Sequence, residues 1–317
     1  MNITLVHNMK LPVVKYGGTE RVVWALGRQL VRMGHHVTFL LPKGSSCPFA
    51  RVITLDPTRS IGSQIPEDTD VVHFSNGADH TDLKKPYVVT LNGNAPPYHY
   101  TDPNSIFVSR NHAERYGCES YVYNGLDWDD YGTPDLSLPR RRFHFLGKAA
   151  WRVKNVRGAI RIAKKIEGGE LDVLGGYRLN LKMGFRLTLS PRIHFHGMVT
   201  NEEKQYYIQQ SRGLIFPVKW HEPFGLCLIE SLYYGAPVFA TPMGAIPEIV
   251  TPDVGFLSND EQELADYINS HPDFSPQHCH DYAVERFNVR VMAEAYLQKF
   301  ETVMNGQTLI PQTNTNV

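Results

Sequence analysis

An α/β fold with parallel sheets is predicted for this chain by the order of its apolar segments. Short continuous apolar runs, typical of strands buried on both faces, alternate with segments whose apolar residues recur at helical spacing. A stretch rich in turn formers, between residues 127 and 142, divides this alternation into two series. The 317 residues, 42% of them hydrophobic, are enough for one large core or two ordinary ones. We therefore expect two α/β domains.

The first series begins with a strand at residues 3–6. A loop containing Gly17-Gly18 follows, and a helix is expected from Thr19, a suitable N-cap, to about residue 33. The helix has one apolar face, and Gly34 ends it. Further strands are predicted at residues 37–41, 52–55, 71–74, 87–91, 106–109 and 121–123.

The stretch from residue 127 to residue 142 is interpreted as a domain connection, and Asn124-Gly125 just before it as a turn. Its three consecutive arginines, 140–142, are typical of a solvated linker rather than a binding patch. We expect an N-terminal domain at residues 1–135 and a C-terminal domain at residues 140–288. A polar tail occupies residues 306–317.

The second series repeats the same alternation. Strands are predicted at residues 143–146, 171–174, 193–196 and 213–217, and helices at 156–166, 201–210 and 226–234. The helix at 226–234 ends at Gly235, a common helix terminator. A last helix is expected at about residues 289–305.

Composition argues against several classes of function. The chain has 32 basic and 32 acidic residues, a balance that does not support nucleic-acid binding. Its four cysteines are scattered without a C-x-x-C pair, as expected for a reducing compartment. The first residues do not resemble a signal peptide, and no run of 18 apolar residues occurs. We expect a cytoplasmic protein with at most peripheral membrane contact.

Two glutamates mark the candidate site. Glu222 lies on the loop between the strand at 213–217 and the helix at 226–234, and Glu230 lies in that helix. Gly225, at the start of the helix, lets backbone N–H groups approach a phosphate, whose charge the helix dipole favours. A carboxylate accepts two hydrogen bonds and so suits the vicinal hydroxyls of a sugar or ribose. These features together indicate a sugar nucleotide.

The stretch from Glu222 to Glu230, with Pro-Phe-Gly after the first glutamate, resembles the E-x7-E signature of the retaining glycosyltransferases of family 4. The resemblance continues in family order through Gly235-Ala236-Pro237-Val238, Gly244, Pro247-Glu248 and Gly255-Phe256-Leu257. It implies the GT-B fold, in which two Rossmann-like domains with parallel sheets face a central cleft. The second domain would hold a nucleotide-sugar donor and the first a glycan or lipid-linked acceptor. The last helix would pack back on the first domain.

The resemblance also implies roles for individual residues. Glu222, Lys154 and Lys148 would be the catalytic group, Glu222 at the transferred sugar and the two lysines at the leaving diphosphate. Lys148 stands where the family usually has arginine, and a lysine lacks the bidentate fork of a guanidinium. Glu230 would accept hydrogen bonds from ribose. The other expected donor-binding residues are Gly17, Gly18, Gly147, Gly175, Phe224, Gly225 and Leu226.

In the first domain, Gly17-Gly18 follows the first strand, where open α/β sheets bind ligands, although a glycine pair also suits a flexible connector. His73 and Asn92 stand at strand ends on the expected acceptor side. Many family members have histidine at the position of Asn92, so the histidine contact to the donor sugar is not expected here.

No cofactor and no metal are expected besides the nucleotide-sugar substrate. The chain has no Asp-x-Asp motif near the site, and His194 and His196, alternating on one strand, have no recognisable third ligand. Two other functions remain open on the same fold. A sugar-nucleotide epimerase would turn over the donor without an acceptor, and a non-catalytic protein would only bind it.

Overall fold

The structure, a computed structural model, describes residues 1–13, 17–77, 81–95, 102–181 and 183–311. The chain separates into two compact units: Met1–Asp127 with Phe287–Val317 form unit 1, and Trp128–Arg286 form unit 2. Residues 312–317 of the expected polar tail lie outside the described residues. Among the described residues, none of the helices combines the length and the apolar character that a membrane span requires.

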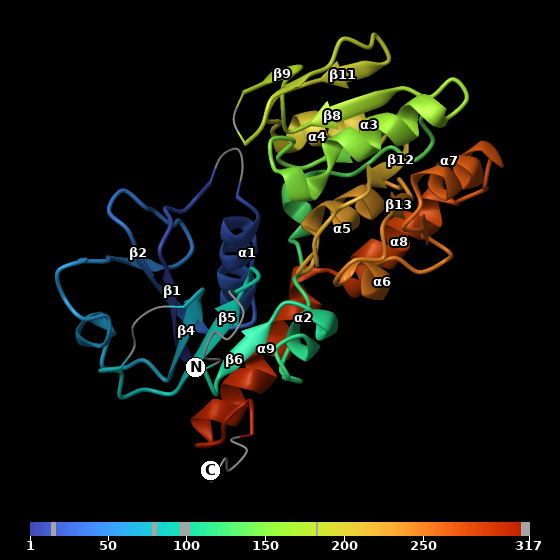
Figure 1. The fold of residues 1–317 in the computed structure, drawn as a ribbon. Helices are drawn as coiled ribbons and strands as arrows, with labels where there is room; N and C mark the ends of the chain where they lie inside the picture. The colour runs from blue at the N-terminus through green and yellow to red at the C-terminus, as the bar shows by residue number, and fades with distance from the viewer. Residues whose placement is uncertain (14–16, 78–80, 96–101, 182, 312–317) are drawn as a thin grey trace, which may run out of the picture. The chain divides into compact units, whose positions relative to one another are not determined.

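Six parallel strands form the sheet of unit 1 in the spatial order β3-β2-β1-β4-β5-β6 (Figure 1). They are β1 (Asn2–His7), β2 (His36–Leu41), β3 (Arg51–Thr54), β4 (Val71–Ser75), β5 (Tyr87–Leu91) and β6 (Ser105–Phe107). The strand predicted at residues 121–123 is wrong: Tyr121 makes only an isolated bridge to Phe107, the last residue of β6. Because β6 is three residues long and ends at Phe107, residues 122 and 123 have no β6 residues to pair with.

Two long helices cover the same sheet. Helix α1 (Gly18–Arg32) packs on β1 and β2 through its apolar face, which includes Val22, Leu26 and Leu30. Helix α9 (Val289–Met304) lies beside α1 and against β5. The short helix α2 (Arg110–Glu114) follows β6. The last helix of the chain therefore belongs to the first unit.

The sheet of unit 2 also has six parallel strands, in the order β11-β8-β7-β12-β13-β14. They are β7 (Arg142–Leu146), β8 (Leu171–Leu174), β11 (Ile193–Phe195), β12 (Ser211–Phe216), β13 (Val238–Ala240) and β14 (Gly255–Leu257). Counted along the chain within each unit, both sheets have the strand order 3-2-1-4-5-6 of a doubly wound fold. A separate pair, β9 (Leu179–Asn180) and β10 (Arg186–Leu187), is antiparallel.

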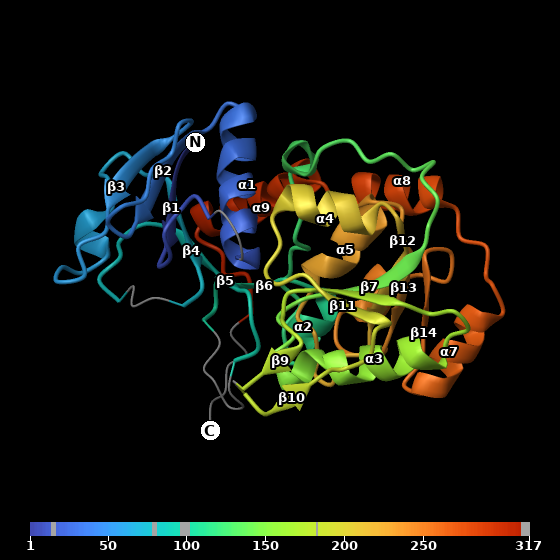
Figure 2. The same cartoon turned by 90° about the horizontal axis from the view of Figure 1, so that it is seen from above.

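Helices cover both faces of this sheet, as a parallel sheet requires. Figure 2 shows α3 (Val156–Lys165) and α7 (Glu261–Asn269) on one face. On the other face lie α4 (Asn201–Ile208), α5 (Leu226–Tyr233) and α8 (Pro276–Arg286). A one-turn helix, α6 (Ile246–Ile249), contacts α5.

The segment interpreted as a connection is built into unit 2. The indole of Trp128 stacks on the ring of Tyr233 with centroids 4.3 Å apart. The Arg140 guanidinium donates to the carbonyl oxygens of Ser211 at 2.7 Å and Tyr234 at 3.2 Å. Arg140 therefore connects the start of β12 to the end of α5. For Arg140, the interpretation as a solvated linker residue is wrong.

Candidate active site

An ion pair occupies the point where the strand order of unit 2 reverses, between β7 and β12. Lys154 follows β7 and Glu222 follows β12, so both lie beyond the carboxyl ends of adjacent parallel strands. Doubly wound sheets bind ligands at this position. The Lys154 Nζ atom lies 2.6 Å from Oε2 of Glu222, and only 12% and 7% of the two side chains are exposed.

Aromatic rings surround the lysine. Its Nζ lies 4.9 Å from the ring centroid of Trp220 and 5.2 Å from that of Phe216, distances at which a cation is attracted to the ring face. The indole N–H of Trp220 also donates to Oε2 of Glu222 at 2.7 Å. Both donors use Oε2, and within the part of the chain that the structure describes no hydrogen bond reaches Oε1. One carboxylate oxygen is therefore available to a ligand.

Lys154 is held in place by the residue that follows it. Asn155 adopts the left-handed conformation (φ 54°), and its side-chain amide donates to the Pro217 carbonyl at 2.7 Å. Its side-chain oxygen accepts from the Gly158 N–H and thereby caps α3. The Lys219 N–H donates to the Val153 carbonyl at 2.7 Å. These contacts join the loop after β7 to the loop after β12.

Glu222 is positioned by close backbone packing against Gly244. The two residues form an isolated parallel bridge, and the Ala245 N–H donates to the Glu222 carbonyl at 2.9 Å. Gly244 has φ +69°, and a Cβ atom there would lie 2.3 Å from the Glu222 carbonyl oxygen. A side chain at position 244 would therefore displace Glu222.

Helix α5 begins directly after this loop. Gly225, with φ +96°, precedes its first residue, Leu226, and a Cβ atom there would lie 2.9 Å from the side chain of Leu228. The Phe224 side chain is 2% exposed and packs in the core. Phe224 and Gly225 can therefore serve a ligand only through their backbone, at the positive end of the helix dipole.

Glu230, in the same helix, forms a second ion pair with a residue of α4. Its Oε1 accepts from the Tyr131 hydroxyl at 3.0 Å and from Nζ of Lys204, which lies on α4. The Lys204 ammonium also lies 5.0 Å from the ring centroid of Tyr131. Both donors again use one oxygen, and among the described residues Oε2 accepts no hydrogen bond. Glu230 is thus oriented by its partners and keeps one acceptor for a ligand.

Glycines shape the strand ends beside this pair. Gly175 follows β8 with φ +126°, and a Cβ atom on it would lie 2.1 Å from the Gly147 carbonyl oxygen after β7. The Ala149 N–H donates to the Gly175 carbonyl at 2.9 Å. Only glycine permits this approach of the two loops. The Lys148 side chain is exposed, with its Nζ 5.4 Å from the ring centroid of Trp151.

The expected residues of unit 1 fall into two groups. Gly17 and Gly18 stand at the start of α1, after β1. Asn92 follows β5, and its side-chain amide donates to Oγ of Ser75 and Oδ1 of Asn76, both at 3.3 Å. These three positions lie at the carboxyl end of the sheet.

His73 belongs to the core instead. It is 2% exposed, bonds the Thr90 hydroxyl at 2.7 Å through Nε2, and packs against the ring of Tyr296 from α9. Burial lowers the pKa of His73 to about 3, so the imidazole is neutral. The expectation that His73 stands on the acceptor side is wrong, because its side chain is directed from β4 into the packing with α9.

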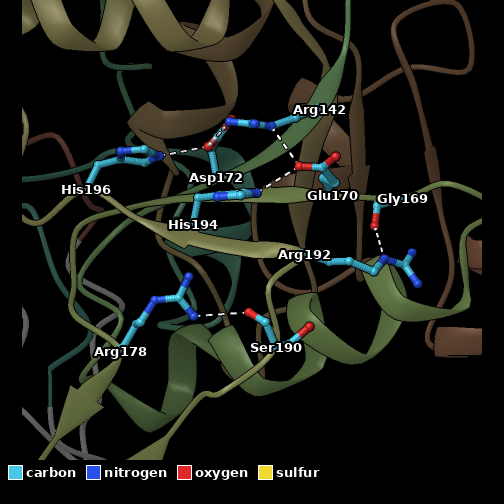
Figure 3. A network of polar contacts seen from close by, with 9 residues as sticks. All are labelled: Arg142, Gly169, Glu170, Asp172, Arg178, Ser190, Arg192, His194 and His196. Carbon is cyan, nitrogen blue, oxygen red and sulfur yellow. Dashed lines mark hydrogen bonds and ion pairs between the residues drawn. The ribbon is translucent and has the colours of Figure 1, made fainter.

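His194 and His196 point to one sheet face, as their spacing indicates, and each bonds a carboxylate (Figure 3). His194 Nε2 lies 2.8 Å from Oε2 of Glu170, and His196 Nε2 lies 2.7 Å from Oδ1 of Asp172. Arg142 contacts both carboxylates and is the first residue of β7, so it is part of the sheet rather than of a linker, although its side chain is 41% exposed. The described residues contain no group of three His, Cys, Asp or Glu side chains placed to hold a metal ion.

Sequence reasoning missed three residues of the site. Tyr131 lies in the stretch interpreted as a connection, Lys204 on a polar helix, and Trp220 just before Glu222. Lys204 offered a signal, because Ile208 one turn later places it on the buried face of α4. The partnership of Tyr131 with Glu230 spans 99 positions and has no local signal.

Two comparisons by sequence each cover less than half of the chain, and the family match lies in unit 2. Residues 140–271 match the model of the family described as glycosyl transferases group 1, a range that contains Lys154, Glu222 and Glu230. A Klebsiella pneumoniae protein, named as an uncharacterized 41.2 kDa protein in the cps region, is 28% identical over 115 residues. This match covers 34% of the present chain and 32% of the relative, about a third of each.

Similar solved structures cover nearly the whole chain. AviGT4, a glycosyltransferase involved in avilamycin A biosynthesis, is 19% identical with a TM-score of 0.76, over 97% of this chain and 99% of that one. Anabaena HepE in complex with UDP and glucose is 16% identical with a TM-score of 0.67, over 95% and 100%. The chain thus has the GT-B fold with two Rossmann-like domains, as expected, and the comparisons support a glycosyltransferase.

Proposed function

We propose that this protein is a metal-independent, retaining glycosyltransferase that transfers a sugar from a nucleotide-sugar donor to a glycan or lipid-linked acceptor. The observation that carries the proposal is the buried Lys154–Glu222 pair at the strand-order reversal of unit 2. It lies in the segment that matches the glycosyltransferase family model. HepE, named as a complex with UDP and glucose, supports a donor of this kind.

The pair suits a ligand that carries negative charge at one end and hydroxyl groups at the other. Lys154 would turn from Glu222 to the diphosphate, and Glu222 would then accept hydrogen bonds from hydroxyls of the transferred sugar. After this exchange of partners, Lys154 would be paired with the diphosphate and Glu222 would be hydrogen-bonded to the sugar. Neither buried charge would be left without a partner, a state that would cost a large amount of free energy. The closely packed backbone at Gly147 and the N–H groups at Gly225 and Leu226 would receive the phosphates.

Breaking the glycosidic bond leaves negative charge on the nucleoside diphosphate. Lys154 would stabilise this charge as it develops, and exposed Lys148 would add a second cation at the mouth of the loop. Each of the two site carboxylates, Glu222 and Glu230, already has a lysine partner. Lysine ammonium groups at the site would therefore stabilise the charge on the leaving group, as a divalent ion does in metal-dependent enzymes.

Glu230 would bind the nucleoside. Its Oε1 is occupied by Tyr131 and Lys204, so we assign the ribose hydroxyls to Oε2. Gly175 would lie beside the base. On the acceptor side, Gly17, Gly18 and Asn92 remain the candidate residues of unit 1. We place the reaction in the cytoplasm, because all four cysteines are free, as in proteins of reducing compartments.

Incubation of the purified protein with nucleotide sugars, first alone and then with acceptor mixtures, tests this function. The donor should be identified beforehand by thermal shift with UDP, GDP, ADP and CMP. A nucleotide at about 100 times its Kd stabilises the protein by roughly 2.7 kcal/mol. Donor consumption that depends on an acceptor supports a transferase. Conversion of the donor without any acceptor would instead indicate an epimerase, and binding without turnover a non-catalytic protein.

A further inference from the structure

A short antiparallel strand pair with its flanking residues in unit 2, residues 177–181 and 183–189, displays apolar side chains to solvent. We call this segment the apolar hairpin; it contains β9 and β10. Every odd-numbered residue in it is apolar and at least half exposed, from 50% for Leu187 to 81% for Leu189. Seven of the eleven exposed large hydrophobic residues recorded for the described chain lie here. They are Tyr177, Leu179, Leu181, Met183, Phe185, Leu187 and Leu189.

The hairpin reverses the usual arrangement of a surface strand pair. Leu179 and Leu187 are cross-strand partners on the outer face, and the next pair, Asn180 and Arg186, turns inward. Arg186 is only 7% exposed. Its guanidinium donates to the Thr188 hydroxyl and lies 4.7 Å from the ring centroid of Phe195. The polar face therefore packs on the protein, and the apolar face remains uncovered.

Arginines hold the hairpin in this position. Arg178 donates to the Ser190 carbonyl at 3.0 Å, and Arg192 donates to the Gly169 carbonyl at 2.6 Å (Figure 3). Near the start of α3, Arg152 donates to the Met183 carbonyl at 3.0 Å, and Arg157 donates to the Phe185 carbonyl. The outward display of the apolar residues is thus built into the fold.

The charge of the same region is one-sided. Residues 176–192 contain four basic residues and no aspartate or glutamate, whereas the whole chain has equal numbers of basic and acidic residues. Arg186 and Arg192 bond groups within the protein, whereas Arg178 is exposed. Arg152 and Arg157, both exposed, add to the positive charge beside the hairpin. Apolar side chains flanked by cations are complementary to a membrane surface that contains anionic lipids.

We propose that the apolar hairpin inserts into the interfacial region of a membrane containing anionic lipids and attaches the protein to it. The apolar side chains would enter the boundary between head groups and acyl chains, and the exposed Arg152, Arg157 and Arg178 would remain at the phosphates. A second copy of the chain is a poorer occupant, because pairing two hairpins would bring like charges together. The inference goes beyond the proposed transferase function and does not depend on it.

Vesicle flotation of the full chain, without any nucleotide sugar, tests the proposal. The protein should float with vesicles of phosphatidylcholine and phosphatidylglycerol in equal parts, and poorly with phosphatidylcholine alone. High salt should weaken this binding, because it screens the arginines. The double variant Leu181→Ser/Phe185→Ser should bind roughly tenfold more weakly or worse, since it loses two inserted apolar side chains. Both residues are more than 60% exposed, so the fold should survive.

A matched control is Tyr206→Ser/Val291→Ser, which removes exposed apolar side chains outside the hairpin. It should bind like the unaltered protein, and thermal unfolding should show both double variants folded. Equal flotation of the hairpin variant and the unaltered protein would overturn the proposal, as would equal binding to the two kinds of vesicle. Absence of flotation, together with a concentration-dependent dimer that the hairpin variant abolishes, would identify a second copy as the occupant and also overturn it.

Discussion

Lys154 and Glu222 form an ion pair of 2.6 Å in a nearly buried site, and the Trp220 indole donates to the same carboxylate oxygen. Each side chain is therefore the main counter-charge of the other. Removal of either leaves a buried charge unpaired, so a loss of activity in a single variant mixes chemistry with stability. Variants that change both residues separate the two effects.

We expect Lys154→Met to lower the rate of transfer by about a hundred- to a thousandfold, because the leaving diphosphate loses a cation that acts on developing charge. The same variant should lose about 3 kcal/mol of unfolding free energy, since the Glu222 carboxylate loses its partner. Lys154→Met/Glu222→Gln should recover most of the stability and none of the activity. Urea denaturation and donor turnover measure the two quantities. If Lys154→Met were as stable as the unaltered protein, Lys154 could not be the buried counter-charge of Glu222.

Glu230→Gln should affect nucleotide binding more than chemistry. Ribose contacts act equally on bound substrate and transition state, so we expect the donor KM to rise about tenfold while kcat stays within about threefold. The amide still accepts from Tyr131, but Lys204 loses its counter-charge. Glu230→Gln/Lys204→Met controls for that loss. Glu222→Gln should show the opposite split, with kcat falling. A large fall in kcat at constant KM for Glu230→Gln would argue against the ribose assignment.

The product should keep the anomeric configuration of the donor sugar. This prediction comes from the resemblance of the Glu222–Glu230 stretch to retaining enzymes, and no nucleophile is assigned to it. Proton NMR of the product at early times distinguishes the two anomers before they equilibrate. An inverted product would contradict the retaining mechanism while leaving the fold unaffected.

Transfer activity should survive exhaustive EDTA treatment. The two carboxylates of the proposed site, Glu222 and Glu230, are each engaged by a lysine, and a divalent cation binding to them would have to displace these ammonium groups. Activity before and after chelation, and after Mn²⁺ addition, checks this. Loss on chelation with recovery on Mn²⁺ would show that the charge-stabilising role assigned to the lysines is wrong.

Stability should fall as the pH drops from about 6.5 towards 5. Burial lowers the pKa of His73 and His144 to about 3 and that of His112 to about 4. Below pH 6.5 the unfolded chain takes up protons that these folded imidazoles do not. Each of these histidines therefore lowers the free energy of unfolding by at most about 1.4 kcal/mol for each pH unit of acidification. Urea denaturation across this range measures the slope. His112→Phe removes one of these titrating imidazoles, so its free energy of unfolding should depend less steeply on pH. An unchanged dependence would contradict the lowered pKa of His112.

Much of the architecture follows from local pattern. The strand predicted at residues 171–174 is β8, and the helix predicted at 156–166 is α3 to within one residue. Buried parallel strands are short apolar runs, and helices against them repeat their apolar residues at helical spacing, so both patterns are visible in a single sequence. The residue types around Glu222 and Glu230 likewise indicate a sugar-nucleotide site without a structure.

Only the tertiary structure decided which partners these groups have. Lys154 and Glu222 are 68 positions apart, and Glu230 meets Lys204 and Tyr131 across 26 and 99 positions. The direction of the apolar hairpin was also decided by the tertiary structure. Its alternating residues show the period of a strand, but not whether the apolar face points to the core or to solvent, because that depends on which polar groups the rest of the fold offers to Arg186. Residue order determined the elements and the chemistry of the site; contacts between distant segments determined its geometry and the direction of the hairpin.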